Sequence, residues 1–108
     1  MSSVHFVAEA RLEFLAEVAY YQNIQTNLGL DFSAAVEAAA ARICAFPLSG
    51  SPAVAGTRRV LLYSFPFALF YLYDGSSVFV LAVAHTSRKP NYWASRVKND
   101  QAVVRVDA

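Results

Sequence analysis

The apolar residues in the first part of the chain recur with the period of an α-helix. From Ala8 to about Gln22 the main apolar positions alternate at steps of four and three residues, which predicts one amphipathic helix. These positions are Ala8, Leu12, Leu15 and Ala19. The apolar stripe is widened by Phe14, Val18 and Tyr21.

An acidic strip runs beside this apolar stripe. Glu9, Glu13 and Glu17 follow one another at steps of four, so their carboxylates lie on one side of the helix and repel each other. We therefore expect all three to face water and to have no catalytic role.

A second helix is predicted after a break at residues 27–29. Gly29 is suited to the left-handed conformation that ends a helix, and Asp31 complements the positive end of the next one. The apolar face of this second helix is predicted to comprise Phe32, Val36, Ala39, Ile43 and Phe46. Pro47 then stops the helix. Two helices joined by so short a link are expected to pack antiparallel as a helical hairpin.

Beyond Gly56 the period of the apolar residues changes from the helical value to two. Segments 57–63, 67–73 and 78–84 are rich in β-branched and aromatic residues, are bounded by turn-forming residues and are predicted to be strands. Their links are short and one contains Asp74-Gly75, a strong hairpin signal, so neighbouring strands should be antiparallel. Residues 4–7 offer a short further strand.

These elements predict an α+β fold, with an N-terminal helical hairpin packed on a mostly antiparallel sheet of three to four strands. The length of 108 residues suits one domain, which we place at 1–97. Residues 98–108 are expected to form a tail, either as an added strand or as a mobile segment.

The predicted sheet is apolar on both faces. Alternation along 67–73 places Phe67, Leu69, Tyr71 and Tyr73 on one face and Ala68, Phe70 and Leu72 on the other. A helical hairpin covers one face only. The other face therefore needs the C-terminal segment, a second copy or another protein to shield it.

Composition and charge also favour a partner. Hydrophobic residues make up 56% of the chain and charged residues only 16%. Residues 1–56 carry two arginines against five acidic side chains, a net charge of −3, whereas residues 57–108 carry seven basic against three acidic, a net charge of +4. Such asymmetry lets a nearly neutral protein present a basic surface to an acidic partner or a polyanion.

The same inventory excludes several classes of protein. A single cysteine, Cys44, rules out an intramolecular disulfide and fits a reducing cytosol. We expect no secretory signal and no membrane contact, because the uncharged apolar run 60–73 is too short to span a bilayer. Since the sequence lacks a phosphate-binding glycine loop, a nucleophile elbow and metal-ligand spacing, we expect no metal and no cofactor.

The candidate chemistry is concentrated directly after the last predicted strand. This segment contains His85, Arg88, Tyr92, Trp93 and Arg96. Such a group could bind RNA phosphate, stack a base and use an imidazole as general acid or base, which is what metal-free RNA cleavage requires. The alternative is structural: a histidine that ends a strand and aromatic residues that pin a C-terminal turn to the sheet.

A second pair of cations precedes this segment in the sequence. Arg58 and Arg59 open the first long strand, and they would reach the same neighbourhood if that strand lay beside the last one. Arginines at strand ends are more often surface or partner-binding residues than catalytic ones.

Taken in order over residues 4 to 96, the chain resembles the RelE/ParE superfamily of bacterial type II toxins. The N-terminal elements of this resemblance are Tyr20-Tyr21, Gly29-Leu30-x-Phe32 and Pro47. The C-terminal elements are Arg58-Arg59, Phe65-Pro66-Phe67, the strand end Ala82–His85 and Arg88-x-Pro90-x-Tyr92-Trp93.

The resemblance implies a compact α+β toxin in the cytoplasm, neutralised by a cognate antitoxin in a toxin–antitoxin hetero-oligomer. ParE-like members poison DNA gyrase by protein contact, and the modest charge favours this branch, with Arg58, Arg88, Trp93 and Arg96 as target-binding or nucleic-acid-binding candidates. RelE-like members instead cleave messenger RNA in the ribosome, for which Arg59, His85, Arg88 and Tyr92 would be the catalytic residues. A non-toxic binding module of the same fold is the third reading.

Overall fold

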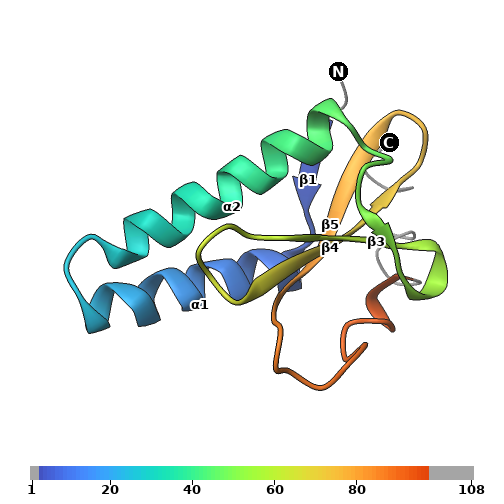
Figure 1. Cartoon of the computed structure of the whole chain (residues 1–108). Coiled ribbons are helices and arrows are strands. Elements are labelled where there is room, and N and C mark those ends of the chain that lie inside the picture. Colours follow the sequence, from blue (N-terminus) through green and yellow to red (C-terminus); the bar gives the residue numbers. More distant parts are fainter. Residues whose placement is uncertain (1–2, 98–108) are drawn as a thin grey trace.

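The computed structural model describes residues 3–97, which form two helices and one sheet (Figure 1). The helices are α1 (Ala8–Ile24) and α2 (Leu28–Ala45), and a short 3-10 helix, η1, spans Val54–Gly56. The strands are β1 (Ser3–Phe6), β2 (Ser51–Pro52), β3 (Arg58–Leu61), β4 (Phe67–Tyr73) and β5 (Ser77–His85).

The five strands lie in the order β1-β5-β4-β3-β2. The β1 strand runs parallel to β5, and the other pairs are antiparallel. The α+β class, the helical hairpin and the mostly antiparallel sheet expected from the sequence are therefore confirmed. The fifth strand was not predicted because β2 is only two residues long, too short to show a period.

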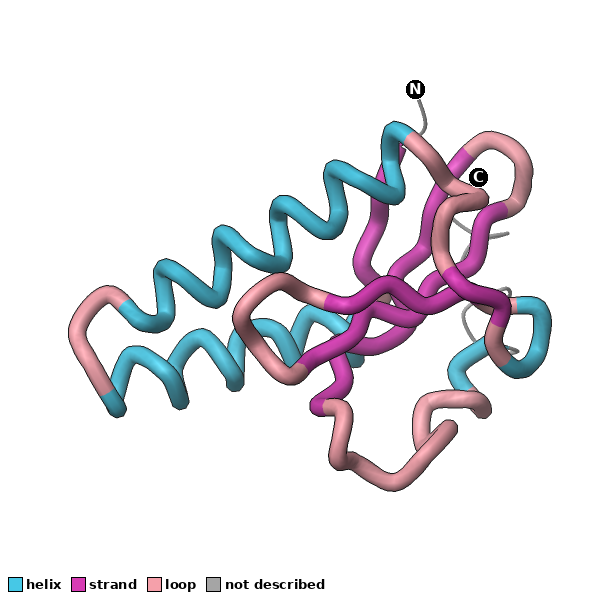
Figure 2. The backbone as a smooth tube through the Cα atoms, in the orientation of Figure 1, coloured by secondary structure: helices cyan, strands magenta, loops and turns pink. Residues whose placement is uncertain are grey.

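The two helices pack closely at the tip of the hairpin, which lies far from the strands in Figure 2. Asn27, not Gly29, takes the left-handed conformation between them, with φ 73°. The prediction for Gly29 was wrong, because α2 begins at Leu28 and Gly29 lies inside its first turn. A Cβ atom at Gly29 would lie 2.6 Å from the carbonyl oxygen of Val18, so the missing side chain permits the contact between the helices.

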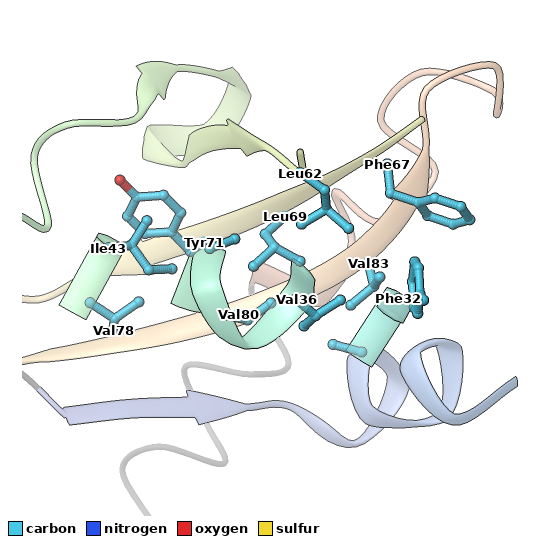
Figure 3. Packing of buried hydrophobic residues seen from close by; sticks show 12 residues of the cluster. Phe32, Val36, Ile43, Leu62, Phe67, Leu69, Tyr71, Val78, Val80 and Val83 are labelled. Carbon is cyan, nitrogen blue, oxygen red and sulfur yellow. The ribbon is translucent and has the colours of Figure 1, made fainter. Parts of the chain in front are cut away.

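The main core lies between the helical hairpin and one face of the sheet (Figure 3). From α2 it takes Phe32, Val36, Ala39 and Ile43, as the sequence predicted. The β4 and β5 strands contribute Phe67, Leu69, Tyr71, Val78, Val80 and Val83. The remaining residue of the predicted face of α2, Phe46, is 69% exposed because the helix ends at Ala45.

A buried tyrosine fastens the end of α2 to the sheet. The hydroxyl of Tyr71 donates to the carbonyl of Pro47 at 2.8 Å and accepts from the backbone N–H of Gly50 at 3.0 Å. The loop after α2 thus has its polar groups satisfied within the apolar layer, which burial requires.

The helix α1 turns a different face to the core from the one predicted. Phe14, Val18 and Tyr21 pack against the core, whereas Leu12 is 67% and Leu15 47% exposed. Two apolar stripes compete on this helix, and the one with two aromatic rings buries more apolar area than the one with two leucines among alanines. The acidic strip is rotated with them, so that Glu13 and Glu17 are half-buried instead of facing water.

The chain itself covers part of the second face of the sheet. Leu81, Ala82 and Ala84 of β5 form a separate cluster with Trp93, against which Phe70, Tyr92 and Val97 pack. In Figure 1 this orange-red segment lies across the sheet from the helices. The sequence offered the C-terminal segment, a second copy or another protein as the shield for this face. The C-terminal segment shields this part of it, which therefore needs no second protein.

No helix within residues 3–97 is long and apolar enough to cross a membrane. The predicted tail at 98–108 lies outside the described residues, so the prediction of an added strand or a mobile segment stands untested.

The close contact between the helices at Gly29 predicts that an alanine there destabilises the protein instead of stabilising it. In an unconstrained helix Gly29→Ala would stabilise the protein by up to about 1 kcal/mol. Here the new methyl group meets backbone, so we expect a loss of about 1–3 kcal/mol in the free energy of unfolding. Urea denaturation of the variant beside wild type measures it, and a gain in stability would contradict the packing described.

Candidate functional site

A cavity of about 450 Å³ opens on the second face of the sheet. Its floor is formed by Ala68, Phe70 and Ala84 of the two central strands. Pro52, Ala53 and Val54 line one side, and the segment that follows β5 lines the other. The cavity exists because that segment crosses the sheet without filling the space up to β2 and η1.

The position of this segment is fixed at the edge of β5. The β1 strand accompanies β5 only as far as Val80, and Leu81 is an extra residue, a bulge, opposite the step between Phe70 and Tyr71. Beyond the bulge, none of the strands within residues 3–97 pairs with β5 on the β1 side. The exposed groups of this edge therefore need other partners.

Two charged side chains supply those partners. Arg96 donates through Nη1 to the carbonyl of Leu81 at 3.0 Å, and Glu13 accepts through Oε1 from the N–H of Val83 at 3.0 Å. Arg96 and Glu13 also bind each other with two hydrogen bonds, of 3.0 and 3.1 Å. The ion pair thus substitutes for a missing strand and ties α1, β5 and the C-terminal segment together.

Tyr92 completes this anchor. Its hydroxyl donates to Oε2 of Glu13, and its ring packs against the guanidinium groups of Arg88 and Arg96, 4.0 and 5.2 Å from the ring centroid. Burial, followed by the hydrogen bond and charge of Glu13, raises the pKa of Tyr92 far above its usual range. The phenol is therefore held in its neutral form, as the donor that this hydrogen bond requires.

The pKa of Arg96 also reflects its pairing with Glu13. Burial alone would lower the pKa of Arg96, but the hydrogen bonds and charge of Glu13 outweigh it and raise that pKa. The guanidinium stays protonated and paired. Both side chains of the ion pair are only 16% exposed, so solvent screens their attraction weakly.

Trp93 has a packing position. It is 1% exposed, and its ring lies 4.4 Å from that of Phe70, measured between centroids. In this conformation the indole is not available to a target protein or a nucleic-acid base.

His85 ends β5 at the mouth of the cavity. Its Nδ1 atom accepts from the backbone N–H of Ser87 at 3.0 Å and contacts the Ser87 hydroxyl at 2.7 Å. Since a backbone N–H can only donate, Nδ1 is unprotonated and the neutral ring carries its proton on Nε2. The loop after β5 therefore fixes the tautomer and leaves the Nε2 N–H as the donor that the neutral ring offers to a ligand.

Of the remaining arginines, Arg58 has a structural role, and Arg59 and Arg88 are exposed. Arg58 is half-buried and donates to the carbonyls of Leu48 and Gly50 at 3.2 and 2.9 Å, which holds the loop before β2. Arg59 and Arg88 are exposed and line the cavity together with Lys89. The rim of the cavity is thus cationic, while its floor is apolar.

The structure brings together four of the residues singled out in the sequence, and these line one cavity: Arg59, His85, Arg88 and Tyr92. Trp93 lines it from within the packed layer, whereas Arg58 and Arg96 are held by internal contacts elsewhere. Sequence reasoning missed Glu13, which holds the wall of the cavity. Its only signal was a carboxylate one position before Phe14, on the helix face that proved to be buried.

No family model matches the sequence, and no curated protein is similar to it. Among solved structures, a chain of the chromosomal ParDE TA system from P. aeruginosa is similar, with a TM-score of 0.67 and 17% sequence identity. The similarity covers 79% of this chain and 96% of that one. This chain shares its fold with that chain of the ParDE system. The fold implied by the RelE/ParE resemblance is thereby confirmed over nearly the whole length of the ParDE chain.

The anchor gives a prediction for stability and for the cavity wall. Glu13→Gln removes the charge that pairs Arg96, and we expect the free energy of unfolding to fall by about 3 kcal/mol. We also expect a red shift in the emission of Trp93, the single tryptophan, as residues 86–97 loosen. Glu9→Gln, one turn earlier on an exposed position, is the control and should change stability by less than about 0.5 kcal/mol. Unaltered stability and emission in Glu13→Gln would refute the anchoring role.

Proposed function

We propose that this chain is the toxin of a type II toxin–antitoxin pair, of the ParE kind, which acts on DNA gyrase by protein contact in the cytoplasm. The observation that carries the proposal is the fold shared with the ParDE protein over 96% of that chain's length. Because a fold alone does not fix a function, the surface has to supply the rest of the argument.

The cationic rim supports an acidic partner. Arg59, Arg88 and Lys89 stand exposed around an apolar floor, so an acidic segment with apolar side chains would find both charge and contact area there. A cognate antitoxin with such a segment fits this surface, and we assign it as the neutralising partner.

The internal contacts of the candidate side chains limit which of them a partner could touch. Tyr92 and Arg96 are both engaged by Glu13, and Trp93 is buried, so three of the candidate side chains serve the anchor. The target-binding role is therefore best placed on Arg59 and Arg88, while Arg58, Trp93 and Arg96 support the surface from beneath.

The first test measures bacterial growth after induction of the chain and DNA supercoiling by gyrase in the presence of the purified chain. Induction of the chain alone should arrest bacterial growth, co-expression of a small acidic protein encoded beside it should restore growth, and the purified chain should inhibit gyrase supercoiling. We expect the double variant Arg59→Ala, Arg88→Ala to raise the concentration needed for inhibition about tenfold or more, which corresponds to about 1.4 kcal/mol.

Arg11→Ala, which removes an exposed arginine from α1 away from the cavity, is the matched control and should inhibit like wild type. Growth that continues normally when the chain is induced without a partner would refute the toxin and favour a binding module of the same fold.

RNA cleavage is the second candidate, and one observation favours it. The cavity places the imidazole of His85 beside Arg59 and Arg88, which joins one side chain able to transfer a proton with two phosphate-binding cations. To act as a general acid the ring must first become an imidazolium, and Nδ1 then gives up the hydrogen bond from the N–H of Ser87. On this reading the ribosome and messenger RNA replace gyrase as the target.

If the chain is a nuclease, His85→Ala should abolish messenger RNA cleavage, read by primer extension after induction, while antitoxin binding stays within about twofold. His5→Ala removes the other histidine, exposed on β1, and should leave cleavage unchanged. Cleavage that survives in His85→Ala would exclude His85 from the mechanism, and gyrase inhibition without cleavage would exclude the nuclease.

A further inference from the structure

The unpaired edges of β5 and β3 are each capped by an arginine. At the edge of β5, Arg96 donates to the carbonyl of Leu81. Glu13 pairs with Arg96 and also accepts from the N–H of Val83, two residues further along the strand. At this edge an arginine therefore satisfies a carbonyl, and a carboxylate satisfies both the arginine and the next free N–H.

The edge of β3 repeats the first half of this arrangement. The β2 strand pairs with only the first two residues of β3, so none of the strands within residues 3–97 covers Val60 and Leu61 on that side. The N–H of Leu62 points to β4, where it donates to Phe67, so the polar groups of Leu61 point to the open side. The carbonyl of Leu61 accepts there from Nη2 of Arg42, in the last turn of α2, at 2.8 Å.

The second half of the arrangement has no counterpart in the described part of the chain. Within residues 3–97, Arg42 has no ion-pair partner, and its Nη1 atom is buried without a hydrogen-bond acceptor. The backbone N–H of Tyr63, two residues after Leu61, has no hydrogen-bond partner among the same residues. Because buried donors are nearly always paired, the Nη1 atom of Arg42 marks a place where an acceptor binds.

The side chain of Tyr63 covers the guanidinium of Arg42. Its ring centroid lies 4.2 Å from Cζ of Arg42, and the side chain is 66% exposed. A π face attracts a cation, but a carboxylate forms shorter and stronger hydrogen bonds with the same group. Exposed side chains change rotamer rapidly, so the ring can give way to a ligand that offers the stronger contact.

We propose that this edge of β3 binds a carboxylate, supplied by an aspartate or glutamate side chain of a partner protein. The carboxylate accepts from Nη1 of Arg42 and from the N–H of Tyr63. Glu13 makes the same two kinds of contact, to a guanidinium and to a strand N–H, at the edge of β5. The donor set of the new site is therefore one that this fold already uses to hold a carboxylate.

The neighbouring side chains favour a protein as the source of the carboxylate. Phe46 follows Arg42 by one helical turn and is 69% exposed, and Leu61 is 50% exposed. Apolar residues beside the acidic one in a partner segment would gain contact area on these side chains, which a free anion cannot do. The inference does not rest on the toxin proposal, because Arg42, Leu61 and Tyr63 are not among the residues that line the cavity.

Titration of the full, isotope-labelled chain with a short peptide, followed by NMR, tests the proposal. The probe is acetyl-Ser-Val-Asp-Leu-Ser-amide, and its uncharged match has Asn in place of Asp. The N–H signals of Leu61 and Tyr63 and the Nε–H signal of Arg42 should shift and saturate, with a dissociation constant on the order of 1 mM. The uncharged peptide should bind about tenfold more weakly or worse, because hydrogen bonds to charged groups are the stronger ones.

Two variants test the role of the guanidinium. Arg42→Gln should weaken binding of the Asp peptide by about tenfold or more. Arg11→Gln, which removes an exposed arginine from α1, is the matched control and should bind like wild type. Because Arg42→Gln also uncaps the carbonyl of Leu61, Tyr63→Ala supplies a variant that keeps the arginine. Removal of the covering ring should tighten binding by about two- to fivefold.

Equal binding of the two peptides, or binding that Arg42→Gln leaves unchanged, would overturn the proposal. Shifts confined to residues 85–91 would also overturn it, since they would place the peptide in the cavity and support the function proposed above. Shifts of Leu61 and Tyr63 that follow the protein concentration without peptide would assign the carboxylate to a second copy of the chain. Tighter binding of inorganic phosphate than of the Asp peptide would assign the site to a phosphate group, against the proposal.

Discussion

A sheet with apolar side chains on both faces has to be covered twice, and the rest of this structure follows from how the chain achieves that. The helical hairpin buries Phe67, Leu69 and Tyr71 on one face. The second cover is a short segment with little secondary structure, which cannot bury enough apolar area to hold itself in place. It is held by polar contacts instead: Glu13 reaches from the first helix past the edge of β5 and binds Tyr92 and Arg96. One carboxylate thus joins the two layers that the sheet separates.

The sequence predicts those parts of the fold in which one pattern has no competitor. In α2 the bulky apolar side chains, Leu30 apart, gather on one face, and Phe32, Val36, Ala39 and Ile43 are buried as expected. The β4 strand falls at the predicted residues 67–73, because turn-forming residues bound it on both sides. On α1 two apolar stripes overlap, and the choice between them depends on which one fits against Phe32 and Phe67. That fit is a property of the assembled core, so local periodicity selected the wrong stripe.

The candidate site shows the same division. Arg59 was expected to meet His85 and Arg88 if its strand lay beside the last one. In the structure β4 lies between β3 and β5, but the cavity extends across β4 and brings the three side chains together. The roles of Tyr92, Trp93 and Arg96 could not be separated from theirs in the sequence, because a cationic and aromatic segment has the same composition whether it faces a ligand or the sheet. What separates them is Glu13, which contacts residues 70 to 83 positions away. Nothing local to Glu13 marks those contacts.

The different roles of the side chains in residues 85–96 also limit the chemistry that the cavity can perform. Cleavage of RNA without a metal needs one group to accept a proton from the attacking hydroxyl and another to donate one to the leaving group. Among the lining residues that the structure describes, His85 is the one histidine, and Tyr92, the other candidate for proton transfer, is committed as a donor to Glu13. A bound phosphate would therefore meet two arginines and a single acid–base group. An acidic protein segment needs no proton transfer at all: exposed cations over an apolar floor are sufficient, and the anchor beneath them keeps that surface rigid enough to be recognised.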